Sequence, residues 1–267
     1  MLKRVKRRVE EYAKNALYGS SLYNPIRSGY QRLFDQERWK FRNRSHQFFS
    51  PFVKQGSLVF DVGAYVGEYS ELFAEMGARV VAVEPNPQNC DALRRVSVAY
   101  NVQLENCAVG NAPGSLRLHI CKENPTITTL SEEWFEAAQH SPAHSKNTWL
   151  PPIEMRVVTL DDLAAKYGQP DFVKIDVEGF DDRVIEGMSF EPAALSFEFN
   201  LEIPNVALGC IGKLSASYEF NFVRGMKIEF QSDRWLRAEE LIAQLQLRCP
   251  PPGAVYGDVV ARKYASV

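Results

Sequence analysis

The sequence lacks the features of membrane-spanning and disulfide-stabilised proteins. No apolar run approaches the roughly 18 residues that a membrane-spanning helix requires. The first residues are basic and have no apolar core or cleavage site, which argues against a signal peptide. The five cysteines are dispersed without CxxC spacing, so we expect neither a disulfide scaffold nor a zinc knuckle. A reducing, cytoplasmic setting fits this pattern best.

Two ligand signatures are also missing. The segment from Gly63 to Gly67 reads Gly-Ala-Tyr-Val-Gly, so the GxGxxG pattern of nicotinamide-binding proteins is absent. His140 and His144 are four residues apart, as two metal ligands on a helix would be, but Pro142 lies between them. We therefore predict no metal ligands from the sequence.

Charge divides the chain unevenly. Its 267 residues have a net charge of -2. Residues 1–50 hold twelve Lys/Arg and four Asp/Glu, or +8, which leaves -10 for the rest. We interpret 1–50 as a basic, aromatic-rich, helical N-terminal extension and 51–267 as the main domain. No RNA-binding motif accompanies the aromatic residues, so nucleic-acid binding is not expected.

Residues 1–17 carry an apolar stripe at helical spacing among basic residues. Two interpretations remain open. The favoured one is a helix that packs on the main domain or on a second subunit. The alternative is a peripheral contact with a membrane surface, although the stripe lacks Trp and Phe.

Residues 57–85 have the order strand, glycine turn, helix, strand, acid that is typical of a nucleotide-binding βαβ unit. We predict strands at Ser57–Val62 and Arg79–Glu84 with a helix at Glu68–Met76 between them. Glycines at 63 and 67 permit a sharp turn and close approach of a ligand.

The rest of the chain continues this alternation, which predicts right-handed crossovers and a doubly wound, mostly parallel α/β sheet. An antiparallel strand is expected near one edge. The predicted strands are 102–109, 114–122, 155–158, 172–176, 195–200, the pair flanking Gly225, and 257–263; the predicted helices are 87–100, 160–167, one ending at Gly187, and 237–246. Residues 122–153 break the rhythm as an insert suited to form a lid over an acceptor pocket.

The glycine turn and the acids after the first two strands predict a site for S-adenosyl-L-methionine. The turn and the following helix N-terminus suit its carboxylate, Asp61 its ammonium, and Glu84 its ribose hydroxyls. The predicted cofactor residues are Asp61, Gly63, Tyr65, Gly67, Glu84, Pro85, Cys107 and Ala108, the last two expected beside the adenine. The structural alternatives are a tightly packed turn, a helix-capping acid before Pro85, and a plain buried strand at 102–109.

A second acidic site follows the strand 172–176. Ligand sites form outside the carboxyl ends of parallel strands, so Asp176 and Glu178 are predicted as catalytic carboxylates. The alternative is that this acidic turn caps the next helix. Glu198 and Asn200 either line the acceptor pocket or have a structural role at the sheet.

Several motifs in order resemble the FkbM family of S-adenosylmethionine-dependent methyltransferases. They are FDVGAYVGEYS, VVAVEPNP, NCAVGNAPGSLRL, VTLDDL and DFVKIDVEGFDDRVIEG. The resemblance covers about residues 55–265, apart from the insert and parts of 201–255. It implies a class I methyltransferase fold and O-methylation of a small-molecule or carbohydrate hydroxyl. Tyr65 stands where this family usually has Asn, and Asp181 where Glu is common.

The sequence leaves two other functions open. A nicotinamide-dependent oxidoreductase would need a tighter glycine turn and a Tyr/Lys or His acid-base pair, and neither is evident. A non-catalytic binding module, docked to a membrane by residues 1–17, would keep the fold without the activity.

Overall fold

The computed structural model describes residues 35–141, 144, 146–225, 227–249 and 255–264. The predicted helical stripe at 1–17 lies outside these residues. The first described element is helix α3 (Gln36–Phe49), which begins where the Asp35 side chain accepts a hydrogen bond from the backbone N–H of Arg38. Phe49 of α3 packs edge-on against Phe73 and Phe172, which attaches the helix to the main domain.

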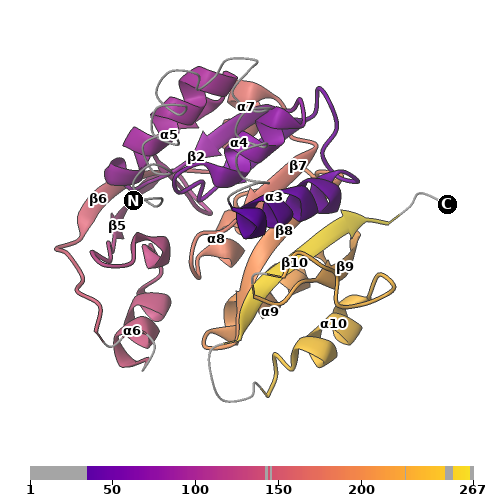
Figure 1. Ribbon diagram of the computed structural model, residues 1–267. Coiled ribbons are helices and arrows are strands. Elements are labelled where there is room, and N and C mark those ends of the chain that lie inside the picture. The colour runs from indigo at the N-terminus through magenta and orange to yellow at the C-terminus, as the bar shows by residue number, and fades with distance from the viewer. Residues whose placement is uncertain (1–34, 142–143, 145, 226, 250–254, 265–267) are drawn as a thin grey trace.

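A seven-stranded sheet forms the centre of the protein (Figure 1), with the order β3-β2-β1-β7-β8-β10-β9. Its strands are β1 (Leu58–Val62), β2 (Arg79–Val83), β3 (Gln103–Glu105), β7 (Phe172–Ile175), β8 (Ala194–Asn200), β9 (Tyr218–Phe222) and β10 (Tyr256–Lys263). The first five strands of this order pair in parallel, and β10 runs antiparallel to both of its neighbours. The predicted doubly wound sheet with an antiparallel strand near one edge is confirmed.

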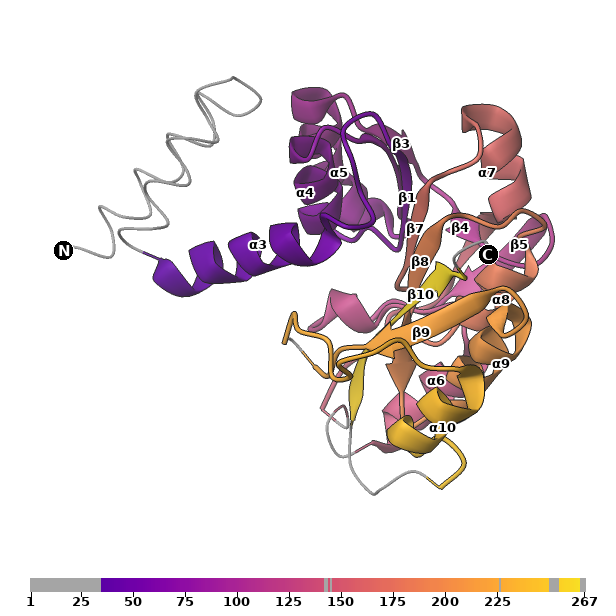
Figure 2. The ribbon, with the colours of Figure 1, turned by 90° about the vertical axis from the view of Figure 1, so that its right-hand side faces the viewer.

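Helices cover both faces of the sheet (Figure 2). On one face lie α3, α4 (Glu68–Glu75) and α5 (Pro87–Tyr100), where Phe49, Phe73 and Leu93 pack against Val59 and Phe172. On the other lie α7 (Leu160–Tyr167), α8 (Asp181–Glu186), α9 (Pro204–Leu214) and α10 (Ala238–Leu245). Strands β1 and β7 are buried along their whole length, as expected for parallel strands covered on both sides.

A small second sheet corrects the prediction of one strand over 102–109. That segment contains two short strands, β3 in the main sheet and β4 (Ala108–Val109) in the second sheet. In the second sheet β6 (Ile153–Val158) lies between β4 and β5 (Gly114–Leu118). Between them the Asn106 amide donates to the carbonyl oxygens of Glu84 and Pro85, at 2.8 and 3.1 Å. These bonds fix the chain where it leaves the main sheet.

The described residues of the region 122–153 pack against the main domain. It contains the 3₁₀ turn η1 (Pro125–Ile127) and helix α6 (Glu132–His140), whose Trp134 is only 2% exposed. A Cβ on Gly179 would lie 3.0 Å from Cβ of Trp134, so α6 packs directly on the loop after β7. His119 is buried and stacks on Phe135.

Two further differences concern the last third of the chain. Helix α9 was not predicted. The second strand predicted after Gly225 is wrong for the described residues 227–230, because the antiparallel partner of β9 is β10. In the described part of 201–217, residues Val206, Ala207, Cys210, Ile211 and Leu214 place an apolar face of α9 on the core.

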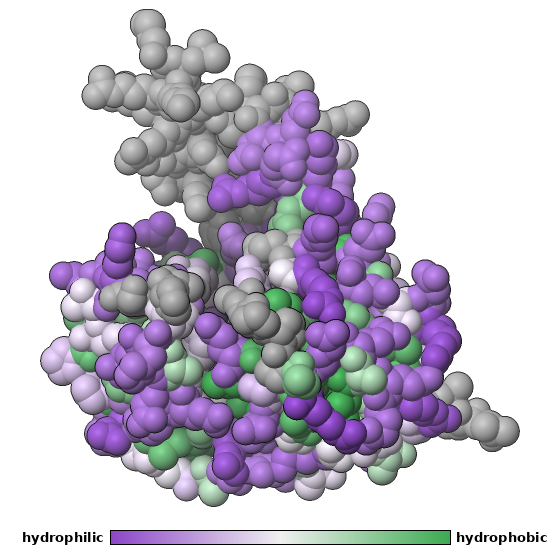
Figure 3. Space-filling view, turned by 90° about the horizontal axis from the view of Figure 1, so that it is seen from below, coloured by the Kyte–Doolittle hydropathy of each residue, from purple (hydrophilic) through white to green (hydrophobic). Residues whose placement is uncertain are grey.

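The described surface is mostly hydrophilic on the face shown in Figure 3. Within the described ranges the large hydrophobic residues that are exposed, Val98, Leu116 and Tyr256, lie on three different elements. No helix among the described residues is long and apolar enough to cross a bilayer.

Candidate functional site

A pocket with an empty volume of about 500 Å³, part of it open to solvent, lies at the carboxyl ends of β1, β2 and β7. This edge of the sheet is where ligands bind in doubly wound folds, at the point where the strand order reverses. Eight of the ten predicted site residues line the pocket: Gly63, Tyr65, Glu84, Pro85, Cys107, Ala108, Asp176 and Glu178. The structure therefore brings the predicted cofactor residues and the predicted catalytic acids into one cavity.

The other two predicted residues, Asp61 and Gly67, do not line the pocket. Asp61 is 1% exposed and accepts a hydrogen bond of 2.5 Å from the Ser70 hydroxyl of α4. Burial raises the pKa of Asp61, and the nearby Lys174 ammonium opposes that rise. Gly67 precedes α4, and a Cβ there would lie 2.5 Å from Cδ1 of Leu93. Asp61 therefore contacts α4, and Gly67 lies close against α5, on the side of the turn away from the pocket lining.

Gly63 holds the turn against the neighbouring strand. Its φ of +81° is the left-handed conformation that favours glycine, and a Cβ there would lie 1.8 Å from the carbonyl oxygen of Asp176. The next turn residue, Tyr65, also has a positive φ, of 51°. Its backbone N–H donates to a Glu84 carboxylate oxygen at 2.8 Å, so the turn and the acid after β2 form one unit.

Glu84 is buried and well supplied with hydrogen-bond donors. Besides Tyr65, the Asn86 backbone N–H and the Asn89 amide donate to its other oxygen, at 2.9 and 3.1 Å. Burial raises the pKa of Glu84 to about 7, although these three hydrogen bonds oppose the rise. A carboxylate has about four acceptor positions, so an ionised Glu84 retains acceptor capacity toward a ligand in the pocket.

Another part of the pocket lining comes from the insert 122–153, which was predicted as a lid but in which no site residue was named. Pro125, Thr126, Thr128 and Leu130 lie in the region 122–153, yet they line the same cavity as Cys107 and Ala108. The Thr128 hydroxyl oxygen is buried and has no hydrogen-bond partner among the described residues. No local signal marks this wall, because the loop reaches the pocket only through tertiary pairing such as His119 with Thr129.

Asp176 follows β7 and is held by a buried lysine. The Lys174 ammonium is 2.7 Å from Oδ2 of Asp176 and 4.7 Å from the centre of the Tyr69 ring. Burial disfavours the charge on Lys174, but Asp176, Asp61 and Asp258 outweigh that effect and raise its pKa. One oxygen of Asp176 is therefore committed to Lys174, and the other remains available.

Glu178 is not the helix-capping residue that the alternative interpretation required. Helix α8 begins after Phe180 without any side-chain cap. Glu178 instead has a φ of 54°, and the Thr129 hydroxyl donates to its carbonyl oxygen at 2.7 Å. Burial and the neighbouring carboxylates of Asp176 and Asp181 raise the pKa of Glu178 well above its usual range. Carboxylates whose pKa is shifted in this way are typical of residues that transfer protons in active sites.

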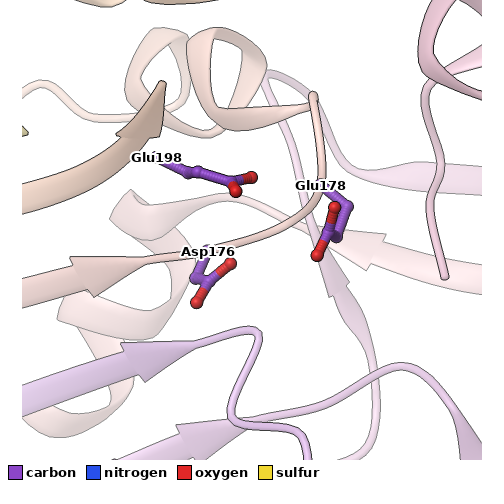
Figure 4. A group of neighbouring side chains, drawn as sticks. All are labelled: Asp176, Glu178 and Glu198. Atoms are coloured by element: carbon purple, nitrogen blue, oxygen red, sulfur yellow. The ribbon is translucent and has the colours of Figure 1, made fainter. Parts of the chain in front are cut away.

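Glu198 of β8 joins these two acids. One carboxylate oxygen from each of Asp176, Glu178 and Glu198 lies within 4.8 Å of the others, and Figure 4 shows the three side chains directed into a common space. Burial and the carboxylates of Glu178, Asp176, Asp181 and Asp258 raise the pKa of Glu198 well above its usual range. Asn200, the other residue considered on this strand, accepts instead from the backbone N–H of Glu202.

The chain is distantly similar to several solved methyltransferase structures. A precorrin-6y C5,15-methyltransferase from Geobacter metallireducens has 14% identity and a TM-score of 0.43, covering 84% of this chain and 87% of that one. An rRNA methylase from Streptococcus thermophilus has 11% identity and a TM-score of 0.42, covering 83% and 95%. Scores at this level carry no argument about substrate.

One curated sequence relative shares a short segment. A protein named ubiquinone biosynthesis O-methyltransferase, from Methylocella silvestris, is 31% identical over 72 residues. The match covers 27% of this chain and 28% of the relative, so this chain aligns with less than a third of the relative's length.

A family model matches most of the chain. The methyltransferase FkbM domain model covers residues 61–234, which is 174 of 267 residues and includes every predicted site residue. The glycine turn, the acid after β2 and the acids after β7 all lie within the match. The chain therefore belongs to the FkbM family of methyltransferases, with S-adenosyl-L-methionine as its cofactor.

Proposed function

We propose that this methyltransferase transfers the methyl group to a hydroxyl oxygen of a small-molecule or carbohydrate acceptor. The observation that carries the proposal is the shared pocket, in which Glu84 and the acids Asp176 and Glu178 line one cavity. A hydroxyl must lose its proton when it is methylated, and these carboxylates stand beside the predicted donor site. The name of the Methylocella relative, an O-methyltransferase, agrees with this chemistry.

The cofactor fits the residues at one end of the pocket. Glu84 would accept a hydrogen bond from a ribose hydroxyl, because it lines the cavity and, when ionised, has about one unused acceptor position. Backbone groups of Gly63 and Tyr65 would approach the methionine part, while Pro85, Cys107 and Ala108 would contact the adenine. Asp61 would act on this end indirectly, by holding the turn through Ser70.

Proton removal would fall to the acids at the other end. S-adenosyl-L-methionine supplies an electrophilic methyl group on a sulfonium. As the new C–O bond forms and the S–CH₃ bond breaks, the acceptor proton would move to Glu178, whose raised pKa suits a general base. Asp176, held by Lys174, would orient the acceptor hydroxyl. Alignment in the pocket can contribute roughly 7–11 kcal/mol and proton removal on the order of 10²–10⁴-fold.

The remaining predictions concern regions around this site. We propose that residues 122–153 shape the acceptor side of the pocket, with Pro125 to Leu130 as its wall. The division into an extension over 1–50 and a methyltransferase domain over 51–267 stays our interpretation. Membrane contact through 1–17 lies outside the described residues and stays a prediction, as does the cytoplasmic setting.

The test is methyl transfer from isotopically labelled S-adenosyl-L-methionine to a panel of polyols, sugars and phenols. The proposal expects a product whose carbon NMR signal is that of an O-methyl ether. Glu178→Gln should slow single-turnover transfer by at least about 100-fold, whereas Glu133→Gln, an exposed acid on α6, should not. Methylation of nitrogen or carbon alone would overturn the proposal. Tight binding of NADH in place of S-adenosylhomocysteine would favour the oxidoreductase alternative.

A further inference from the structure

The carboxylates of Asp176, Glu178 and Glu198 converge from two adjacent parallel strands. Lys174 of β7 pairs with Ser196 of β8. Continuing this register by two residues places Asp176 opposite Glu198 on the same face of the sheet. Glu178, two residues beyond Asp176, turns back toward both, and one oxygen of each acid lies within 4.8 Å of the others (Figure 4).

Further acids surround this group. Asp258 of β10 lies directly opposite Glu198 in the antiparallel pairing. Asp181 is 1% exposed, and its Oδ1 accepts from the Glu198 backbone N–H at 3.2 Å. Its other oxygen, Oδ2, is buried without a hydrogen-bond partner among the described residues. A positively charged group bound beside these acids would offset the cost of this unpartnered buried oxygen.

Lys174 supplies only part of that positive charge. Its ammonium is bonded to Oδ2 of Asp176, which leaves Oδ1 of that residue for another partner. Within the described residues, no hydrogen bond engages the side-chain oxygens of Glu178 or Glu198. Both side chains are half-buried, so the space between them can be reached from solvent.

We propose that Asp176, Glu178 and Glu198 bind a divalent cation of the hard, oxygen-preferring class, such as Mg²⁺, Mn²⁺ or Ca²⁺. The group contains only carboxylates, which suit these ions rather than Zn²⁺. Two ligand oxygens on opposite sides of a cation are about 4.2 Å apart for Mg²⁺ and about 5 Å apart for Ca²⁺, twice the usual metal–oxygen distances. The three carboxylate oxygens lie within 4.8 Å of one another, so no pair is farther apart than two ligands on opposite sides of Ca²⁺.

The location gives the cation a role in the proposed reaction. Asp176 and Glu178 also line the cofactor pocket, so a cation on these residues would stand at the acceptor side of the transferred methyl group. There it would bind the acceptor hydroxyl, lower its pKa and hold it in line with the donor. The carboxylate oxygens not bound to the cation would remain free to take the proton. Only this consequence depends on the proposed O-methylation; the binding site itself rests on the geometry of the three acids.

The test is titration of the full chain with MnCl₂ after removal of metals by EDTA, followed by calorimetry and by the electron paramagnetic resonance signal of free Mn²⁺. We expect one Mn²⁺ per chain and displacement by Mg²⁺ or Ca²⁺. Glu198→Gln and Glu178→Gln should each raise the Mn²⁺ dissociation constant at least tenfold. Glu133→Gln serves as the matched control and should leave it unchanged. Thermal melting and circular dichroism of each variant establish that it is folded, and two variants are used so that misfolding of one does not end the test.

Three results would overturn the proposal. The first is the absence of stoichiometric Mn²⁺ binding to the wild-type chain. The second is an unchanged Mn²⁺ dissociation constant in folded Glu198→Gln and Glu178→Gln. The third is a loss of S-adenosylhomocysteine affinity in Glu198→Gln without any Mn²⁺ binding, which would assign the acids to the cofactor's own ammonium. No cofactor or acceptor is present in the Mn²⁺ titration. A chain that does not bind Mn²⁺ would therefore leave the O-methylation proposal standing. A chain that does not methylate oxygen would leave the cation site to be tested by the same titration.

Discussion

Gly63 lies against the backbone of Asp176, so closely that a Cβ on Gly63 would be 1.8 Å from the Asp176 carbonyl oxygen. This contact joins the turn after β1 to the strand end that carries Asp176 and Glu178, the predicted catalytic acids. The cofactor turn and the acidic loop are therefore positioned by each other, and the distance between them is set by the absence of a side chain.

Gly63→Ala tests this contact against a matched glycine. Gly56 has nearly the same φ, +83°, but a Cβ there would meet nothing within 4 Å. We expect Gly56→Ala to lower the free energy of unfolding by about 1 kcal/mol, from backbone strain alone. Gly63→Ala should cost at least about 2 kcal/mol more, because a backbone carbonyl must also move. Urea denaturation measures both. Equal losses would show that the turn is not fixed by β7.

The raised pKa of Glu84 predicts opposite pH trends for stability and for cofactor affinity. The folded state retains the Glu84 proton up to about pH 7, whereas the unfolded chain releases it near 4.5. Stability from this group is therefore present below pH 4.5 and is lost as the pH rises to 7, by about 3 kcal/mol in total. Affinity for S-adenosylhomocysteine should rise as the pH passes through about 7, where folded Glu84 ionises and gains a free acceptor position for a ribose hydroxyl.

Glu84→Gln provides the comparison for these trends. Wild type should lose unfolding free energy between pH 4.5 and 7 relative to Glu84→Gln, which has no carboxyl to titrate at this position. The control Glu133→Gln should lose as much as wild type over the same pH range. Chemical denaturation and calorimetry over pH 4.5–8 give both quantities. A wild-type pH profile in Glu84→Gln would mean that Glu84 does not titrate in this range.

Trp134 tests whether α6 belongs to the folded body rather than to a loosely attached lid. Its side chain is 2% exposed and packs against Gly179, next to the acidic loop. We expect Trp134→Ala to lower the free energy of unfolding by about 3 kcal/mol or more. Leu116→Ala, at a residue 41% exposed, should change it by less than about 0.5 kcal/mol. A small effect of Trp134→Ala would indicate that α6 opens independently of the core.

Much of this structure could be predicted from local sequence. Apolar runs that end in an acid gave β1, β2 and β7, and glycine spacing gave the turn, because both patterns depend on neighbouring residues. Eight of ten predicted site residues line the pocket for the same reason. Asp61 and Gly67 do not line the pocket. Which residues of the turn face the pocket depends on how the turn packs against α4 and α5.

The misses arise from pairings between distant segments. The split of 102–109 depends on β6, some fifty residues later, and on the Asn106 amide. The position of Glu198 beside Asp176 follows from the register of β7 with β8, which no local pattern reports. Thr128 reaches the pocket only because residues around it pair with the end of β5.

Calorimetric titration with S-adenosylhomocysteine measures whether the cofactor binds between the glycine turn, Glu84 and the acids after β7. The account predicts that Glu84→Ala, folded by circular dichroism, binds at least about tenfold more weakly than wild type at pH 8, a loss of about 1.4 kcal/mol. Glu133→Gln should bind as wild type does. Unchanged affinity in Glu84→Ala would contradict the account, because the acid that lines the pocket after β2 would then have no part in holding the cofactor.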